Sequence, residues 1–185
     1  TDGTPRIITV TQAGTLKGNE MILRTAKILK EVFHFDFTWR VAGNRESFIR
    51  FERKTGISCE DVGIELLGMI PAEQVVDELT AARVYVHPAI IDNSPNSLCE
   101  AQTLGCPGIA TYAGGIPRMV QDGETGFLYP YDEPYALAFK IMGVTDDREK
   151  LEYISAKERT TALARHAPQA IAERVMEIYR RILKV

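Results

Sequence analysis

Short apolar runs alternate with helix-like segments along the whole chain, and this alternation limits the fold more than any other feature of the sequence. The helix-like segments repeat apolar residues every three or four positions, as Ile22, Ala26, Leu29 and Phe33 do. Parallel strands that are buried on both faces read as continuous apolar runs, and helices connect one such strand to the next. The pattern therefore predicts a layered α/β domain around a parallel sheet.

In detail, the sequence predicts a Rossmann-like three-layer domain with a mostly parallel sheet of about six strands and a helical C-terminus. The expected strands are Arg6–Thr11, Phe37–Ala42, Val62–Leu67, Val84–His87, Gly108–Thr111 and Gly126–Tyr129. The expected helices are Asn19–Phe33, Glu46–Thr55, Pro71–Ala82 and Asn96–Leu104, with a helical turn at Pro117–Val120. We expect one domain over residues 1–185, in which residues 134–185 form a helical tail with breaks near Gly143 and Pro168.

Composition narrows the class of protein. The chain has 185 residues, 45% of them hydrophobic and 25% charged, which is ordinary for a globular domain. A formal net charge of -3 argues against nucleic acid as a partner, and no apolar run approaches the roughly 18 residues of a transmembrane helix. The three cysteines lack metal-ligand spacing, so we expect buried thiols in a reducing, cytoplasmic setting and no required metal.

Polar or glycine-rich segments follow five of the predicted strands. They are Gly14–Gly18, Gly43–Asn44, Gly68–Met69, Asp92–Glu100 and Gly114–Gly115. Ligands of open parallel sheets bind outside the carboxyl ends of the strands. We therefore expect these segments to converge on one edge of the sheet and to form one binding site there.

Asp92 and Glu100 are the most informative side chains of that edge, because the first lies in a loop and the second lies one to two turns into the helix that follows. The free N–H groups at the start of such a helix suit an anion such as a diphosphate. Lys17 follows the first strand and could add a cation, although Gly14–Gly18 matches neither the dinucleotide fingerprint nor the P-loop. Each residue also has a plainer interpretation as a solvated charge or a turn residue, and His87 one as a packed strand end.

Longer motifs surround these residues. They are His87-Pro88, Asp92-Asn93-Ser94-Pro95-Asn96-Ser97-Leu98-Cys99-Glu100-Ala101, Leu104-Gly105-Cys106-Pro107, Gly114-Gly115-Ile116-Pro117 and Asp122-Gly123-Glu124-Thr125-Gly126-Phe127-Leu128. In these motifs the chain resembles the C-terminal domain of retaining family-four glycosyltransferases, which have the GT-B fold. The resemblance is specific from about Val62 to Pro130 and extends more loosely back to Arg6.

The resemblance implies a site for a nucleoside-diphosphate sugar, which is a substrate, and no separate cofactor. It implies that Glu100 holds the ribose hydroxyls, that Asp92 binds hydroxyls of the transferred sugar, and that Lys17 neutralises the diphosphate; these three are the candidate catalytic residues. The implied donor-binding residues are Gly14, Gly68, Met69, Asn96, Ser97, Leu98, Gly114 and Gly115. Two positions depart from the family pattern: Asp92 replaces a glutamate, and residues 11–15 lack the arginine that commonly accompanies the lysine.

By this resemblance the chain supplies the donor site for sugar transfer to an acceptor hydroxyl with retention of configuration. Its implied partners are an N-terminal acceptor domain that this sequence lacks and an acceptor glycan or lipid-linked sugar, in the cytoplasm or at the inner face of the membrane. The last helix, at about Ala170–Leu183, would then expose an apolar stripe, unless that stripe packs on this domain's own core. The alternatives are a sugar-nucleotide epimerase of the same fold and a non-catalytic nucleotide-binding module.

Overall fold

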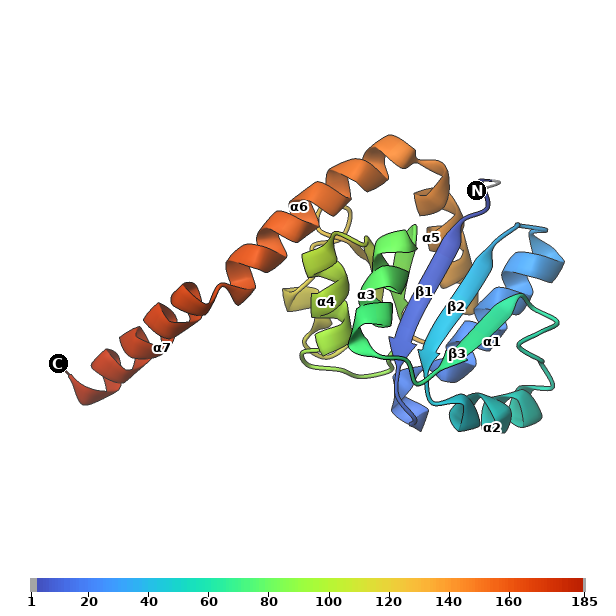
Figure 1. The fold of residues 1–185 in the computed structure, drawn as a ribbon, viewed down its shortest axis with the longest axis horizontal. Helices are drawn as coiled ribbons and strands as arrows, with labels where there is room; N and C mark the ends of the chain where they lie inside the picture. The colour runs from blue at the N-terminus through green and yellow to red at the C-terminus, as the bar shows by residue number, and fades with distance from the viewer. Residues whose placement is uncertain (1–2, 185) are drawn as a thin grey trace.

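A parallel six-stranded sheet lies at the centre of the computed structural model, which describes residues 3–184 (Figure 1). Its strands are β1 (Arg6–Thr11), β2 (Thr38–Gly43), β3 (Ile64–Gly68), β4 (Val84–His87), β5 (Gly108–Thr111) and β6 (Phe127–Tyr129). All five pairings are parallel, in the order β3-β2-β1-β4-β5-β6. The predicted sheet is confirmed, and its strand order reverses between β1 and β4.

Four helices connect β1 to β5, as the alternating pattern predicts: α1 (Asn19–Lys27), α2 (Arg45–Thr55), α3 (Ala72–Ala81) and α4 (Asn96–Leu104). Three more helices follow β6: α5 (Pro134–Asp146), α6 (Arg148–His166) and α7 (Pro168–Leu183). Short turns of 3-10 helix, η1 (Thr15–Lys17) and η3 (Ile116–Arg118), precede α1 and follow β5. A π-helical turn, η2 (Ile28–Val32), continues α1 to the end that the sequence predicts near Phe33.

The core has two halves, one on each face of the sheet. Neighbouring residues of β1 point to opposite faces, so Ile7 packs with α1, α2 and α5 on one side, while Ile8 packs with α3 and α4 on the other. Both side chains are fully buried. Because the strand is covered on both faces, the consecutive side chains of Ile7, Ile8 and Thr9 are all fully buried.

The predicted break near Gly143 is wrong. Helix α5 runs through Gly143, because Ile141 and Val144 on either side of it are buried in the core. A glycine costs about 1 kcal/mol inside a helix, which is less than the roughly 1.5–3 kcal/mol gained by burying one such side chain. The chain breaks instead at Asp147, whose carboxylate caps α6 by accepting the N–H of Lys150 at 3.0 Å.

The second predicted break, near Pro168, is confirmed, because α6 ends at His166 and α7 begins at Pro168. Helix α5 and the first part of α6 belong to the core, through Leu137, Ile141 and Ile154. Helix α7 projects from the domain beyond the end of α6 (Figure 1).

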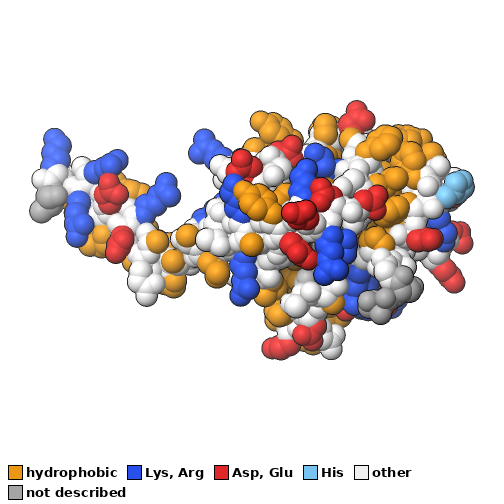
Figure 2. All heavy atoms as spheres, turned by 90° about the horizontal axis from the view of Figure 1, so that it is seen from above, with side chains coloured by type: hydrophobic (Ala, Val, Ile, Leu, Met, Phe, Trp, Pro, Cys, Tyr) orange, Lys and Arg blue, Asp and Glu red, His pale blue; other side chains and the backbone are white. Residues whose placement is uncertain are grey.

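The apolar stripe of α7 is exposed, as predicted, and the alternative that it packs on the domain's own core is wrong. No residue of α7 is buried. The side chains of Val175 and Ile182 are 43% and 70% exposed, respectively, and Figure 2 shows apolar side chains along this helix among Lys and Arg.

Candidate functional site

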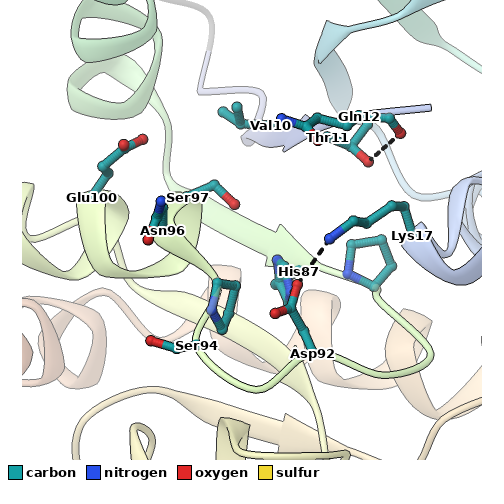
Figure 3. Close-up of a pocket in the computed structure, with 12 residues that line it drawn as sticks. Val10, Thr11, Gln12, Lys17, His87, Asp92, Ser94, Asn96, Ser97 and Glu100 are labelled. Carbon is teal, nitrogen blue, oxygen red and sulfur yellow. Dashed lines mark hydrogen bonds and ion pairs between the residues drawn. The ribbon is translucent and has the colours of Figure 1, made fainter. Parts of the chain in front are cut away.

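A cavity of about 460 Å³ opens at the carboxyl ends of β1 and β4, where the strand order reverses (Figure 3). Connections from neighbouring strands diverge at such a point and leave a crevice between them. The lining residues come from β1 with its loop, from β4 with its loop, and from the start of α4. They are Val10, Thr11, Gln12, Lys17, His87, Pro88, Asp92, Ser94, Pro95, Asn96, Ser97 and Glu100.

The two loops of the cavity interlock through backbone contacts. Gly18 packs so closely on the β4 loop that an added Cβ would lie 1.8 Å from the carbonyl oxygen of Pro88. The N–H of Ile90 donates to the carbonyl of Leu16 at 2.8 Å. These contacts bring Lys17 to the β4 loop, where its Nζ lies 3.1 Å from Asp92 Oδ2.

Gly114 and Gly115 support the loop that carries Asp92. The N–H of Gly115 donates to the carbonyl of Asp92 at 2.9 Å. An added Cβ would lie 2.3 Å from the Asp92 carbonyl oxygen at Gly114, and 2.1 Å from that of Asn93 at Gly115. Neither glycine lines the cavity. The two glycines instead contact the backbone of the β4 loop.

The start of α4 faces the cavity with N–H groups that have no protein acceptor in the described part of the chain. Its N-cap, Pro95, makes no side-chain cap, and the first paired amide is that of Cys99, which donates to the Pro95 carbonyl at 3.1 Å. The side chains of Asn96 and Ser97 line the cavity. The side chain of Leu98 is buried in the core, which leaves only its backbone N–H for a ligand.

His87 is a buried polar residue of the site. It is 5% exposed, and its Nδ1 lies 3.1 Å from the hydroxyl of Tyr85, which donates to Ser97 Oγ at 2.8 Å. Its Nε2 has no hydrogen-bond partner among residues 3–184 and lies 3.7 Å from Asp92 Oδ2. Burial lowers the pKa of His87 to about 4, so the imidazole is neutral at pH 7.

The cavity thus brings together Lys17, Asp92, Asn96, Ser97 and Glu100, and Figure 3 shows Glu100 across the cavity from Lys17 and Asp92. The other candidates lie apart from it. Gly14 lines a neighbouring hollow with Asn44, whereas Gly68 ends β3 and the next residue, Met69, is 82% exposed.

Sequence reasoning did not single out Thr11, Gln12 or Ser94, which also line the cavity. Their signal was their position, since Thr11 ends β1, Gln12 follows it, and Ser94 lies in the loop between β4 and α4. The hydroxyl of Thr11 donates to Asn19 Oδ1 at 3.1 Å, and Asn19 Nδ2 donates to Ser47 Oγ at 2.7 Å. This buried network fixes the end of β1 against the starts of α1 and α2.

Residues 4–147 match the family described as Glycosyl transferases group 1. The chain belongs to this glycosyltransferase family. Among its relatives, this group 1 chain is 30% identical over 122 residues to alpha-maltose-1-phosphate synthase of Mycolicibacterium smegmatis, a stretch that makes up 62% of this chain and 31% of the relative. The chain therefore spans about a third of the length of that relative.

Solved structures share the fold of this group 1 chain. Alr3699/HepE of Anabaena, in complex with UDP-glucose, has a TM-score of 0.79 at 19% identity, and the match covers 96% of this chain and 49% of that one. The C-terminal domain of LpcC from Francisella tularensis, a group 1 glycosyl transferase, has a TM-score of 0.70 at 20% identity over 87% of both chains. Within residues 3–184, no helix is long and apolar enough to cross a membrane.

Proposed function

We propose that this chain binds a nucleoside-diphosphate sugar in the cavity and supplies the donor site of an enzyme that transfers the sugar to an acceptor hydroxyl with retention of configuration. The observation that carries the proposal is one juxtaposition. Lys17, Asp92, Glu100 and the unpaired N–H groups at the start of α4 all face a single cavity between β1 and β4.

The diphosphate fits between α4 and Lys17. Unpaired N–H groups and the positive end of the helix dipole attract an anion, and the Lys17 ammonium approaches from the β1 loop. Transfer of the sugar leaves negative charge on the departing diphosphate, and fixed donors stabilise that charge most strongly as it develops. The α4 amides and Lys17 therefore favour the bond-breaking step itself.

The two carboxylates fit the two sugar rings of such a donor. An ionised carboxylate only accepts hydrogen bonds, which suits the hydroxyls of a sugar. Figure 3 shows Asp92 beside Lys17 and Glu100 farther along α4, so they flank the proposed diphosphate position. We assign the transferred sugar to Asp92 and the ribose to Glu100. The complex of Alr3699/HepE with UDP-glucose makes UDP-glucose the first probe for this chain.

The proposed acceptor domain lies outside this sequence. Relatives such as alpha-maltose-1-phosphate synthase are about three times as long as the stretch they match. We propose that such a domain, N-terminal in the full-length enzyme, binds an acceptor glycan or lipid-linked sugar, and that the exposed stripe of α7 packs against it. The proposal needs no metal, no cofactor and no nucleic acid, and it places the enzyme in the cytoplasm or at the inner membrane face.

The test is calorimetric titration of the 185-residue chain with UDP, GDP and ADP and with UDP-glucose, GDP-mannose and ADP-glucose, in buffer containing EDTA. We expect one nucleotide series to bind. Lys17→Ala should weaken it by about 10-fold or more, because a hydrogen bond to a charged group contributes roughly 1.5–3 kcal/mol. Glu100→Ala should weaken it through the ribose.

Lys30→Ala is the matched control, because Lys30 is exposed on η2, on the opposite face of the sheet from α4. This variant should bind the nucleotides as tightly as wild type. The absence of heat with every nucleotide would refute the donor site. Affinity that is unchanged in both Lys17→Ala and Glu100→Ala would refute the roles given to these residues. Conversion of a free sugar nucleotide without any acceptor, followed by NMR in the full-length enzyme, would instead identify an epimerase.

A further inference from the structure

His87 has no part in the donor site as described so far, although it occupies the centre of the cavity. It ends β4, its side chain is buried, and its Nε2 is without a partner in the described part of the chain. We propose that His87 is a sugar-recognition residue, whose Nε2 accepts a hydrogen bond from a hydroxyl of the donor sugar. This inference rests on the proposed function and adds a second side chain, beside Asp92, to the subsite for the transferred sugar.

The hydrogen bonds behind the ring decide what Nε2 can do. The hydroxyl of Tyr85 donates its single proton to Ser97 Oγ at 2.8 Å. With that proton committed to Ser97, we infer that the Tyr85 oxygen accepts from His87 Nδ1, 3.1 Å away, and that Nδ1 carries the ring proton. A neutral imidazole with its proton on Nδ1 presents Nε2 as a lone pair. Tyr85 is itself fully buried, which holds this arrangement in place.

Two acceptors face each other where the ligand would bind. His87 Nε2 lies 3.7 Å from Asp92 Oδ2, too far for a direct hydrogen bond, and neither atom offers a proton to the other. A sugar hydroxyl about 2.8 Å from Nε2 donates its proton to that nitrogen. The Nζ of Lys17, 3.1 Å from the same Asp92 oxygen, can then donate to that hydroxyl oxygen.

A hydrogen-bond acceptor at Nε2 would bind the sugar of the donor and not its diphosphate. A diphosphate at pH 7 offers acceptors and no donor, so it cannot satisfy the lone pair of Nε2. Burial and the nearby Lys17 charge both lower the pKa of His87, against the opposite effect of Asp92, and the ring therefore stays neutral instead of becoming a cation for phosphate. Only a group with its own proton, such as a sugar hydroxyl, fits this position.

The experiment compares a nucleotide with its sugar conjugate in two variants of this chain. His87→Phe keeps a planar ring but removes both nitrogens, and His87→Gln keeps an acceptor oxygen near the place of Nε2. We expect His87→Phe to weaken binding of UDP-glucose by about 10-fold, which corresponds to about 1.4 kcal/mol, and to leave UDP binding within about twofold of wild type. His87→Gln should retain most of the UDP-glucose affinity. The pairs GDP with GDP-mannose and ADP with ADP-glucose are tested in the same way.

A sugar analogue sharpens the assignment. In a series of UDP-glucose analogues, each with one hydroxyl replaced by fluorine, the analogue that lacks the hydroxyl facing His87 should bind wild type more weakly than UDP-glucose does. The His87→Phe variant should bind that analogue and UDP-glucose equally well. Nitrogen NMR of the ligand-free protein should show the proton of His87 on Nδ1. A thermal unfolding curve for each variant checks that it is folded.

Three results would overturn the inference. Equal losses of UDP and UDP-glucose affinity in His87→Phe would make His87 a packing residue of the cavity. An unchanged UDP-glucose affinity in that variant, or a ring proton on Nε2, would remove the proposed contact. If no nucleotide binds to wild type, the proposed function itself fails, and the two failures are thereby distinguished.

Discussion

Gly115→Ala tests whether the β5 loop sets the position of Asp92. The φ of Gly115 is -88°, which alanine adopts without strain, so the whole effect of the substitution is steric. The new Cβ would lie 2.1 Å from the carbonyl oxygen of Asn93, whereas non-bonded heavy atoms prefer about 3.5 Å or more. The β4 loop must therefore move by more than about 1 Å, and it carries Asp92 with it.

The magnitude follows from two contributions. Overpacking at a tight contact costs roughly 1–3 kcal/mol, and the hydrogen bond from the Gly115 N–H to the Asp92 carbonyl, 2.9 Å long, contributes about 1 kcal/mol. We expect the free energy of unfolding to fall by about 2–4 kcal/mol, measured by urea denaturation. We also expect nucleotide-sugar affinity to fall by about 10-fold or more, since Asp92 leaves its position near Lys17 and His87.

Gly143→Ala is the matched control. Gly143 is exposed within α5, and an added Cβ would meet no atom within 4 Å. Alanine should raise the free energy of unfolding by about 0.5–1 kcal/mol, because glycine is the poorer helix residue, and should leave binding unchanged. If Gly115→Ala proved as stable and as tight-binding as wild type, the support that we assign to the β5 loop would be refuted.

Two further predictions concern stability. Burial raises the pKa of Glu158 from its usual 4.5 to about 8, so between these pH values the native state keeps a proton that the unfolded state releases. The free energy of unfolding should therefore fall as pH rises from about 5 to 8, by up to about 1.4 kcal/mol for each unit of pKa shift. Glu158→Gln should flatten this dependence in urea denaturation at pH 6 and 8.5, and an equally steep fall in the variant would contradict the assignment. Ile154→Ala, at a fully buried position of α6, should cost about 2–5 kcal/mol, whereas Ile178→Ala on the exposed stripe of α7 should change stability by less than about 0.5 kcal/mol. Equal losses in these two variants would show that the stripe is packed in solution.

The sequence predicted the elements and the edge of the sheet that carries the site. Strands and helices are specified by residues only a few positions apart, such as Ile22 and Ala26, whose spacing places both side chains on the face of the helix that packs against the sheet. The convergence of Lys17, Asp92 and Glu100 followed from topology alone, because the carboxyl ends of parallel strands meet at one edge. Family motifs added a prediction of the ligand's chemistry.

Contacts between distant segments needed the tertiary structure. The sequence predicted a break at Gly143, but the burial of its neighbours in the core keeps α5 continuous. It left His87 as either a packed residue or a ligand contact, and only the tertiary structure places its ring between Tyr85 and Asp92.

The pairing of Lys17 with Asp92 joins residues 75 positions apart, and the support of Asp92 by Gly115 joins β4 and β5 loops. Local periodicity specifies which residues face the sheet. The register of the strands and the packing of one loop on another specify which side chains meet, and this information is spread over the whole fold instead of residing in any one segment.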